Sequence, residues 1–293
     1  MESLLGAASN ALIIVFLLST MISIGLEVTL KEIMLAASNK RLFIRASFAN
    51  FILVPFLGLG IARILPMPMN IETGFLLLAA APGALFAINF TRKTQDSVPF
   101  AAALLFALTT LSLVVTPFLA QLLLNFDQPV TLHYDRAIQA VLLYVVLPLL
   151  AGLALNRWAS PMALRLRKPA SACAGISFVV VTVITMDLKS AATKQIGMNG
   201  LLAVLLLIAA SMVIGWMLGG PDRGTRRVLT VNTSMRNVAL ALAIASRSFP
   251  GASVDVGILA FSALMLPPNL LFTIYQSRKM KKLVAQAQSA TAR

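Results

Sequence analysis

Long apolar stretches recur along the whole chain, and each is bounded by charged or turn-forming residues. A helix needs about 20 mostly apolar residues to cross the roughly 30 Å hydrocarbon core of a bilayer. Stretches of this length are expected to be helical, because backbone polar groups cannot stay unpaired in lipid. The pattern predicts an all-α integral membrane protein with nine transmembrane helices, over residues 8–27, 41–64, 72–90, 98–124, 136–157, 170–187, 198–218, 225–247 and 253–276.

The composition of the 293-residue chain agrees with a membrane protein, because 59% of the residues are hydrophobic and only 12% are charged. Soluble domains average about 45–50% apolar and about 25% charged residues. The formal charge of +14 does not indicate nucleic acid, since the basic residues are spread thinly between apolar stretches and form no exposed polar face. The single cysteine, Cys173, leaves no thiol pair for a disulfide or a metal. We therefore expect a lipid bilayer around the protein, and no cofactor or obligate protein partner.

The distribution of Lys and Arg between the stretches predicts the orientation. Most of them lie in the first, third, fifth and seventh connections and in the C-terminal tail. Cytoplasmic segments are enriched in these residues, so the N-terminus is predicted outside and residues 277–293 form a basic cytoplasmic tail. We expect this topology in a bacterial inner (plasma) membrane. The basic residues that then fall on the outer side are Arg63, Arg136, Lys189, Lys194 and Arg247.

One cation, Arg236, falls in the middle of the eighth stretch, where a charge costs at least about 2.5–3.5 kcal/mol. The ten Asp and Glu residues all lie at the ends of stretches or in connections, so none is expected beside it. A guanidinium without a carboxylate partner suits a carboxylate, sulfonate or phosphate brought from outside. The alternative is a structural arginine hydrogen-bonded to backbone carbonyls of a broken helix. The polar residues beside it, Asn232, Thr233, Ser234 and Asn237, favour a binding site.

The third stretch is interrupted by Pro82 and Gly83, which predict a helix break. By the predicted orientation, the third and eighth stretches run in opposite directions. Two interrupted helices of opposite direction in the two halves of a chain are typical of an inverted-repeat transporter, with half-helix N-termini aimed at a site near the midplane. Their dipoles would add to the attraction of Arg236 for an anion. The sequence Pro267-Pro268-Asn269 predicts a further local break.

Three segments carry a family resemblance: Leu76-Leu77-Leu78-Ala79-Ala80-Ala81-Pro82-Gly83, Thr116-Pro117, and residues 229–237. They resemble the bile acid:sodium symporter family, and the resemblance covers nearly the whole chain. It implies a panel domain (about 8–27 and 136–157) and a core domain (about 41–124 and 170–276), with the third and eighth stretches as crossing discontinuous helices. It also implies that Asn237 faces the substrate. Asn50 falls where the family often has a polar residue, and substrate contact and packing are both open for it.

The chain departs from this family at the positions that bind sodium. The family motif Pro-Gly-Gly-Thr-Ala-Ser-Asn is replaced by Pro-Gly-Ala-Leu-Phe-Ala-Ile, with Asn89 one place late. The family Glu and Gln of the second crossing helix correspond to Asn232 and Arg236, and a threonine ligand corresponds to Leu105. Leucine, isoleucine and arginine supply no oxygen for a hard cation. The resemblance therefore implies that Arg236 replaces a sodium ion, and any bound sodium would use Asn232, Thr233 and Asn89.

Together these features predict a secondary transporter that moves a small organic anion, such as a bile-acid-like carboxylate or a sulfonate, by alternating access without sodium. Arg236 would fix the anionic group, Asn237 and Asn232 would hydrogen-bond it, and Thr233, Ser234, Asn89 and Asn50 would complete the site. An enzyme is not expected, because no stretch has His, Asp or Glu near its middle. The alternatives are a sodium-coupled organic anion symporter, a non-transporting receptor or sensor, and an anion channel.

Overall fold

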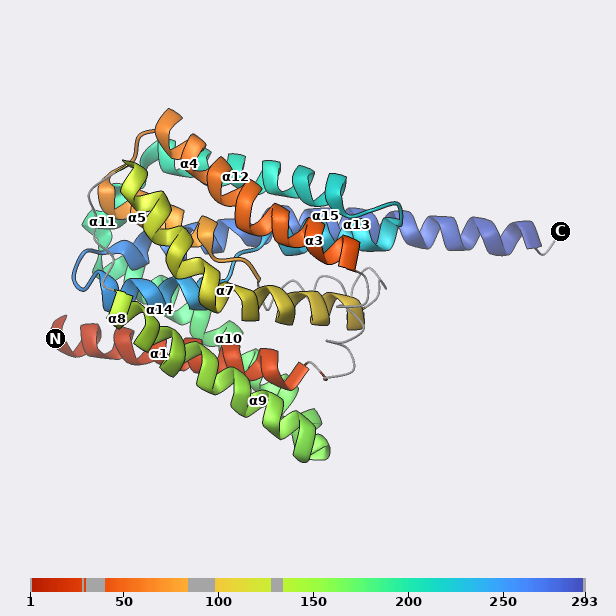
Figure 1. Cartoon of the computed structure of the whole chain (residues 1–293), viewed down its shortest axis with the longest axis horizontal. Coiled ribbons are helices and arrows are strands. Elements are labelled where there is room, and N and C mark those ends of the chain that lie inside the picture. Colours follow the sequence, from red (N-terminus) through yellow and green to blue (C-terminus); the bar gives the residue numbers. More distant parts are fainter. Residues whose placement is uncertain (1, 28, 30–39, 84–97, 128–133, 292–293) are drawn as a thin grey trace.

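The computed structural model describes residues 2–27, 29, 40–83, 98–127 and 134–291, and Asn89 lies outside these ranges. All the regular elements in the described residues are helices (Figure 1). The first half contains α1 (Glu2–Glu27), α3 (Lys40–Phe48), η1 (Ala49–Leu53), α4 (Val54–Ile64), α5 (Met69–Ala80) and α7 (Val98–Asp127). The second contains α8 (Tyr134–Val141), η2 (Leu142–Val146), α9 (Leu147–Trp158), α10 (Ser160–Leu188), α11 (Ser190–Lys194), α12 (Gly197–Leu218), α13 (Arg223–Ser234), α14 (Val238–Ser248) and α15 (Val254–Thr291).

Within the described residues, seven helices are long and apolar enough to cross a membrane. They cover Asn10–Glu27, Lys40–Ile64, Ala107–Leu124, Asp135–Trp158, Ser160–Leu188, Gly197–Leu218 and Val254–Met280. The prediction of a multi-span helical membrane protein is thus confirmed. The third and eighth predicted stretches differ from the rest, because they contain the shorter apolar helices Met69–Ala80 and Val238–Ser248.

Two of the long helices contain a π-helical turn that directly precedes an X-Pro pair. Segment η1 is followed by Val54-Pro55, and η2 is followed by Leu147-Pro148. In both, the residue before proline donates its N–H to the first carbonyl of the π turn, as Val54 does to Ala49 and Leu147 does to Leu142. Proline has no N–H to offer the next carbonyl along, so each π turn leaves one carbonyl without its helical donor.

Two boundaries differ from the expectations. Helix α10 begins at Ser160 rather than near residue 170, and Pro169 lies inside it. The predicted break after Pro267 and Pro268 is wrong, because α15 continues through both prolines to Thr291. The side chain of Asn269 donates to Met265 O at 2.9 Å, one turn back along the continuous helix.

Helices α1, α9 and α10 pack tightly on one another and form a unit that we call the α1 bundle. The helices α1 and α9 meet at Gly25 and Gly152, where a Cβ on Gly25 would lie 2.3 Å from Leu149 O and one on Gly152 would lie 2.4 Å from Ile22 O. At the other edge Arg167 of α10 donates to Leu26 O at 2.7 Å. The range 170–187 was expected in the core domain, whereas its helix packs mainly on α1.

The remaining long helices form a second unit, the α5 bundle, in which α5 packs on α4, α7 and α15, and α12 packs on α13 and α15. Its packing is also close, since a Cβ on Gly74 of α5 would lie 2.7 Å from Val254 O of α15. The buried residues of α5 and α14 are almost all small or aliphatic. Both interrupted helices are thus enclosed by protein, α5 within this bundle and α14 at its boundary, where it also packs on α8 and α1.

Candidate functional site

The two interrupted helices meet at their breaks. Helix α5 ends at Ala80, two residues before Pro82, and α13 ends at Ser234, two residues before Arg236. Pro82 and Arg236 form an antiparallel bridge, in which Asn237 N donates to Ala81 O at 2.8 Å. Gly83 follows with φ +90°, a conformation that favours glycine. Extended backbone from both breaks is thus paired at the centre of the α5 bundle.

Arg236 lies at this crossing and is only 2% exposed. Its guanidinium donates from Nε to Leu78 O at 3.2 Å, and from Nη2 to Ala79 O. It also donates to Asn50, from Nη1 to Oδ1 at 3.0 Å and from Nη2 to the main-chain oxygen at 3.3 Å. An arginine carries five N–H groups, so these four acceptors leave one without a partner among the described residues. Within the part of the chain that the structure describes, these hydrogen bonds all go to uncharged oxygens.

The contacts of Arg236 also satisfy the broken end of α5. The last carbonyls of a helix lack intrahelical donors, and a buried one must find another. Ala79 O accepts from Arg236 and Ala80 O accepts from Thr116 Oγ1 at 2.9 Å, while Leu78 O accepts both from Ala81 N at 3.1 Å and from Arg236. A cation at a helix C-terminus is also favoured by the helix dipole. The geometry is therefore that of the structural arginine, one of the two interpretations of this residue, and binding of a substrate anion stays a prediction.

Asn50 is positioned by the π turn of the second predicted span. The N–H of Val54 goes to Ala49 O and Pro55 has none, so the main-chain oxygen of Asn50 is available to Arg236. The side-chain amide donates to Ala46 O at 2.9 Å and to Thr233 Oγ1 at 3.4 Å. Asn50 thus links α3, α13 and the arginine through a buried network.

The other predicted site residues are buried near the crossing with different roles. Ser234 donates to Asn269 Oδ1 at 2.7 Å, which ties α13 to α15. Asn237 caps α14, because its Oδ1 accepts from Leu240 N at 3.0 Å. Two polar atoms, Asn237 Nδ2 and Asn232 Oδ1, are buried without a hydrogen-bond partner among the described residues. Asn89 lies outside the described ranges and is not placed.

Sequence reasoning missed Asn269 and Thr116 as parts of this network. Asn269 was noted only as the sign of a helix break, and Thr116 only as part of a family motif. A polar side chain within an apolar stretch is the signal that could have found both, because a buried polar group needs a hydrogen-bond partner and can take one from a neighbouring helix.

A buried helix crossing built from two interrupted membrane helices defines a class of membrane transporters. Residues 14–196, more than half of the chain, match the Sodium Bile acid symporter family. The chain belongs to this family of membrane transporters and is not an enzyme.

Individual relatives are distant. The chain is 22% identical over 239 residues to "Probable sodium/metabolite cotransporter BASS1, chloroplastic" of Arabidopsis thaliana, covering 80% of this chain and 59% of the relative. It is 26% identical over 256 residues to the corresponding BASS5 protein of Oryza sativa subsp. japonica, covering 80% and 62%. It is 24% identical over 250 residues to "Uncharacterized sodium-dependent transporter YocS" of Bacillus subtilis, covering 83% and 75%. The chain thus spans about three fifths of the length of these plant relatives.

Proposed function

We propose that this protein carries a small organic anion across the membrane by alternating access and requires no sodium. The single observation that carries the proposal is the enclosure of the Arg236 guanidinium by carbonyl and amide oxygens at the helix crossing. In this proposal the third and eighth spans are discontinuous and complete a set of nine. The panel comprises the α1 bundle, which includes α10, and the α5 bundle is the core.

The oxygens around Arg236 are of the kind that bind a hard cation. Backbone carbonyls and an asparagine amide oxygen are common ligands for such ions. Here the guanidinium is hydrogen-bonded to Leu78 O, Ala79 O and both oxygens of Asn50, so it occupies the centre of this oxygen set. A cation held by a covalent bond cannot be exchanged with solvent. The carrier would then have a permanent positive charge at this site and would not need to bind an ion from either side of the membrane.

The charge of Arg236 also favours an anionic substrate. A cation enclosed by neutral oxygens inside a membrane protein is costly, and an anion that enters the site offsets this cost. In the described conformation the guanidinium is engaged by protein oxygens, so Arg236 supplies the charge and one remaining N–H. Asn237 Nδ2 is buried and has no acceptor among the described residues. We assign it as the direct donor to a carboxylate or sulfonate oxygen, with Asn232 and Thr233 nearby in sequence.

A sodium-coupled symporter is the second candidate, and a different observation favours it. Asn232 Oδ1 is buried with no donor among the described residues, and an unpartnered oxygen suits a cation. The two plant relatives are named as probable sodium/metabolite cotransporters. Sodium, carried as a co-substrate, would then bind at Asn232, Thr233 and Asn89, beside Arg236 rather than in its place.

The test is a flux measurement on the purified protein in proteoliposomes. A ligand set from pyruvate to taurocholate is first screened by thermal shift, and the anions that stabilise the protein are then tested as substrates. Uptake that is equal in sodium and potassium buffers supports the proposal, whereas uptake that disappears in potassium supports the symporter. Binding without flux would identify a receptor.

Two arginine variants complete the test. Arg236→Gln is expected to lose anion stabilisation, while Arg157→Gln, which changes an exposed arginine at the end of α9, retains it. Equal anion binding by Arg236→Gln and the parent would remove Arg236 from the site.

A further inference from the structure

The contacts between the two bundles are concentrated at one end of the molecule, the end where α1 begins. There α8 packs on α14, the end of α10 packs on α15, and α1 packs on α14. Helix α9 continues from α8 toward the opposite end, where it packs mainly on α1 and α10 and diverges from α7 and α3 (Figure 1). The described conformation therefore joins the bundles at one end. By the charge distribution this is the predicted outer end.

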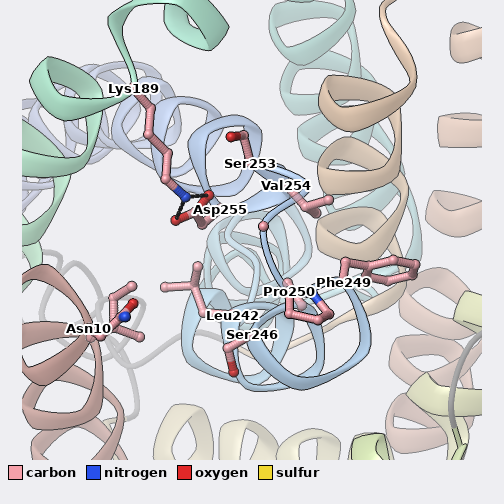
Figure 2. Close-up of a pocket in the computed structure, with 12 residues that line it drawn as sticks. Asn10, Lys189, Leu242, Ser246, Phe249, Pro250, Ser253, Val254 and Asp255 are labelled. Carbon is pink, nitrogen blue, oxygen red and sulfur yellow. Dashed lines mark hydrogen bonds and ion pairs between the residues drawn. The ribbon is translucent and has the colours of Figure 1, made fainter. Parts of the chain in front are cut away.

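An ion pair crosses the boundary between the bundles at this end. Lys189 directly follows α10, and its Nζ lies 2.8 Å from both Oδ1 and Oδ2 of Asp255 in the first turn of α15 (Figure 2). The lysine side chain is 36% exposed and the aspartate 19% exposed. Asp255 also lies in the first turn of α15, where the helix dipole favours a negative charge. Both groups are thus held in place while they remain within reach of water.

A second polar contact crosses the same boundary between a different pair of helices. Arg247 of α14 donates from Nη2 to the Tyr144 hydroxyl at 2.9 Å, and its guanidinium carbon lies 5.6 Å from the centre of the tyrosine ring. Tyr144 belongs to η2, which continues into the α1 bundle through α9. The two contacts are made by different residues on different helices, and each joins the α1 bundle to the α5 bundle.

Between these helices lies a cavity of about 190 Å³ (Figure 2). Asn10 and Ile13 of α1 line one side, Leu242 and Ser246 of α14 line the other, and the Lys189–Asp255 pair borders it. Pockets for organic ligands usually have volumes of about 300–1,000 Å³, so this cavity is small for a substrate site. Its position between the bundles fits the closed end of a passage.

We propose that the Lys189–Asp255 ion pair is a latch that closes the passage between the two bundles at this end. This inference rests on the proposed function, because it requires the bundles to move relative to each other. Formation of the pair stabilises the described conformation, and its separation accompanies opening. A pair that is partly exposed to water is a weak and reversible contact, which suits a link that breaks in every transport cycle.

Cross-linking of two introduced cysteines tests the latch. Cys173 is the single cysteine, so Cys173→Ser provides a background for the pair Lys189→Cys and Asp255→Cys. A bifunctional methanethiosulfonate reagent replaces the length of the lysine side chain, which a direct disulfide could not span. Its reaction is expected to abolish uptake of the anion found above, and reduction is expected to restore it. The matched control is Asn156→Cys with Arg167→Cys, which the same reagent joins between α9 and α10 inside one bundle, where the native Arg167 Nη2 lies 3.3 Å from Asn156 Oδ1. The cross-linked control is expected to keep its uptake. Undiminished uptake by the cross-linked Lys189→Cys and Asp255→Cys protein overturns the latch.

A second measurement does not depend on transport. Spin labels at Ala191→Cys and Ala252→Cys, both exposed beside the latch, report the separation of the bundles in the Cys173→Ser background. Lys189→Gln is expected to increase the population with the longer label distance. An unchanged distance distribution overturns the latch even if the protein carries no anion. Conversely, a shifted distribution without anion uptake would count against the proposed function and leave the latch supported.

Discussion

Arg236 and Asn50 are joined twice, once through the asparagine side chain at 3.0 Å and once through its main-chain oxygen at 3.3 Å. The two residues lie 186 positions apart in sequence, and Asn50 provides two of the four oxygen acceptors of the guanidinium. The main-chain bond is possible because a π turn and Pro55 leave that carbonyl without a helical donor. A local feature of one span thus provides an acceptor for a charge that belongs to another.

Removal of the Asn50 side chain should destabilise the protein. Asn50→Ala deletes one acceptor of a buried guanidinium, and hydrogen bonds to charged groups contribute about 1.5–3 kcal/mol. We expect a lower midpoint in thermal unfolding of the detergent-solubilised protein. Asn199→Ala is the matched control, because it removes an exposed amide that donates to Pro66 O. Equal midpoints for the two variants would mean that the Asn50 contact does not stabilise the crossing.

Asn50→Asp separates the structural role of Arg236 from its role in attracting an anion. The substitution keeps an oxygen at the Nη1 contact and adds a carboxylate that neutralises the guanidinium, at the loss of the amide donation to Ala46 O and Thr233 Oγ1. We expect the fold to be retained and the affinity for an organic anion to fall about tenfold or more, which corresponds to about 1.4 kcal/mol. The measurement is a ligand titration by thermal shift or calorimetry. Unchanged affinity would show that the charge of Arg236 does not contribute to binding.

The replacement of an ion by arginine can be tested by reversing it. By the family resemblance, glutamate and glutamine correspond to Asn232 and Arg236. The double variant Asn232→Glu with Arg236→Gln removes the fixed cation, leaves the carbonyl oxygens of α5 free, and adds a carboxylate. We expect sodium to stabilise this variant and to stimulate its uptake, while the parent responds to neither sodium nor potassium. A double variant that responds equally to both cations would contradict the exchange.

The π turn should matter only where its freed carbonyl has a partner. Pro55→Ala restores an N–H that competes with Arg236 for Asn50 O, so we expect a loss of about 1 kcal/mol of stability and weaker anion binding. Pro148→Ala is the matched control, because it follows an equivalent π turn in which no such contact with arginine is seen among the described residues. Stability and anion titrations of both variants check this. Similar losses for the two prolines would assign the effect to helix geometry alone.

Close packing of α1 on α9 should tolerate no added methyl group. A Cβ on Gly152 would lie 2.4 Å from Ile22 O, so Gly152→Ala must push the two helices apart, at a cost of about 1–3 kcal/mol. Thermal unfolding should show a clear decrease in the midpoint. Gly60→Ala is the control, since nothing lies within 4 Å of its added Cβ and alanine favours the helix. A Gly152→Ala protein as stable as the parent would show that the helices can separate without cost.

The membrane-spanning pattern could be predicted because it depends on hydrophobicity along the chain alone. The start of α10 could not, because Arg167 and its neighbours make residues 160–169 too polar for an apolar stretch. The helix nevertheless extends to Ser160, and Arg167 satisfies Leu26 O at the end of α1. The start of this helix is marked locally by Pro161 in its first turn, a signal that a search for apolar stretches alone does not use.

The same distinction applies to the candidate site. Proline, glycine and a lone arginine in apolar stretches indicate where two helices are interrupted. They do not reveal that Arg236 would donate to the carbonyls of Leu78 and Ala79, because that depends on how the two breaks meet in space. The π turns were also missed, since a π turn differs from an α turn by one residue of hydrogen-bond register and leaves the hydrophobic pattern intact.

A guanidinium fixed at the crossing also has an electrical consequence. With a monovalent anion bound, the site is neutral, and without it the site carries one positive charge. The membrane potential acts on charge that moves, at about 2.3 kcal/mol per elementary charge for each 100 mV. In the proposed carrier, the voltage-sensitive step is then the return of the unloaded site, while the loaded site reorients with little effect of voltage. Transport by this protein should therefore respond to membrane potential most strongly when substrate is scarce on the side toward which the site returns.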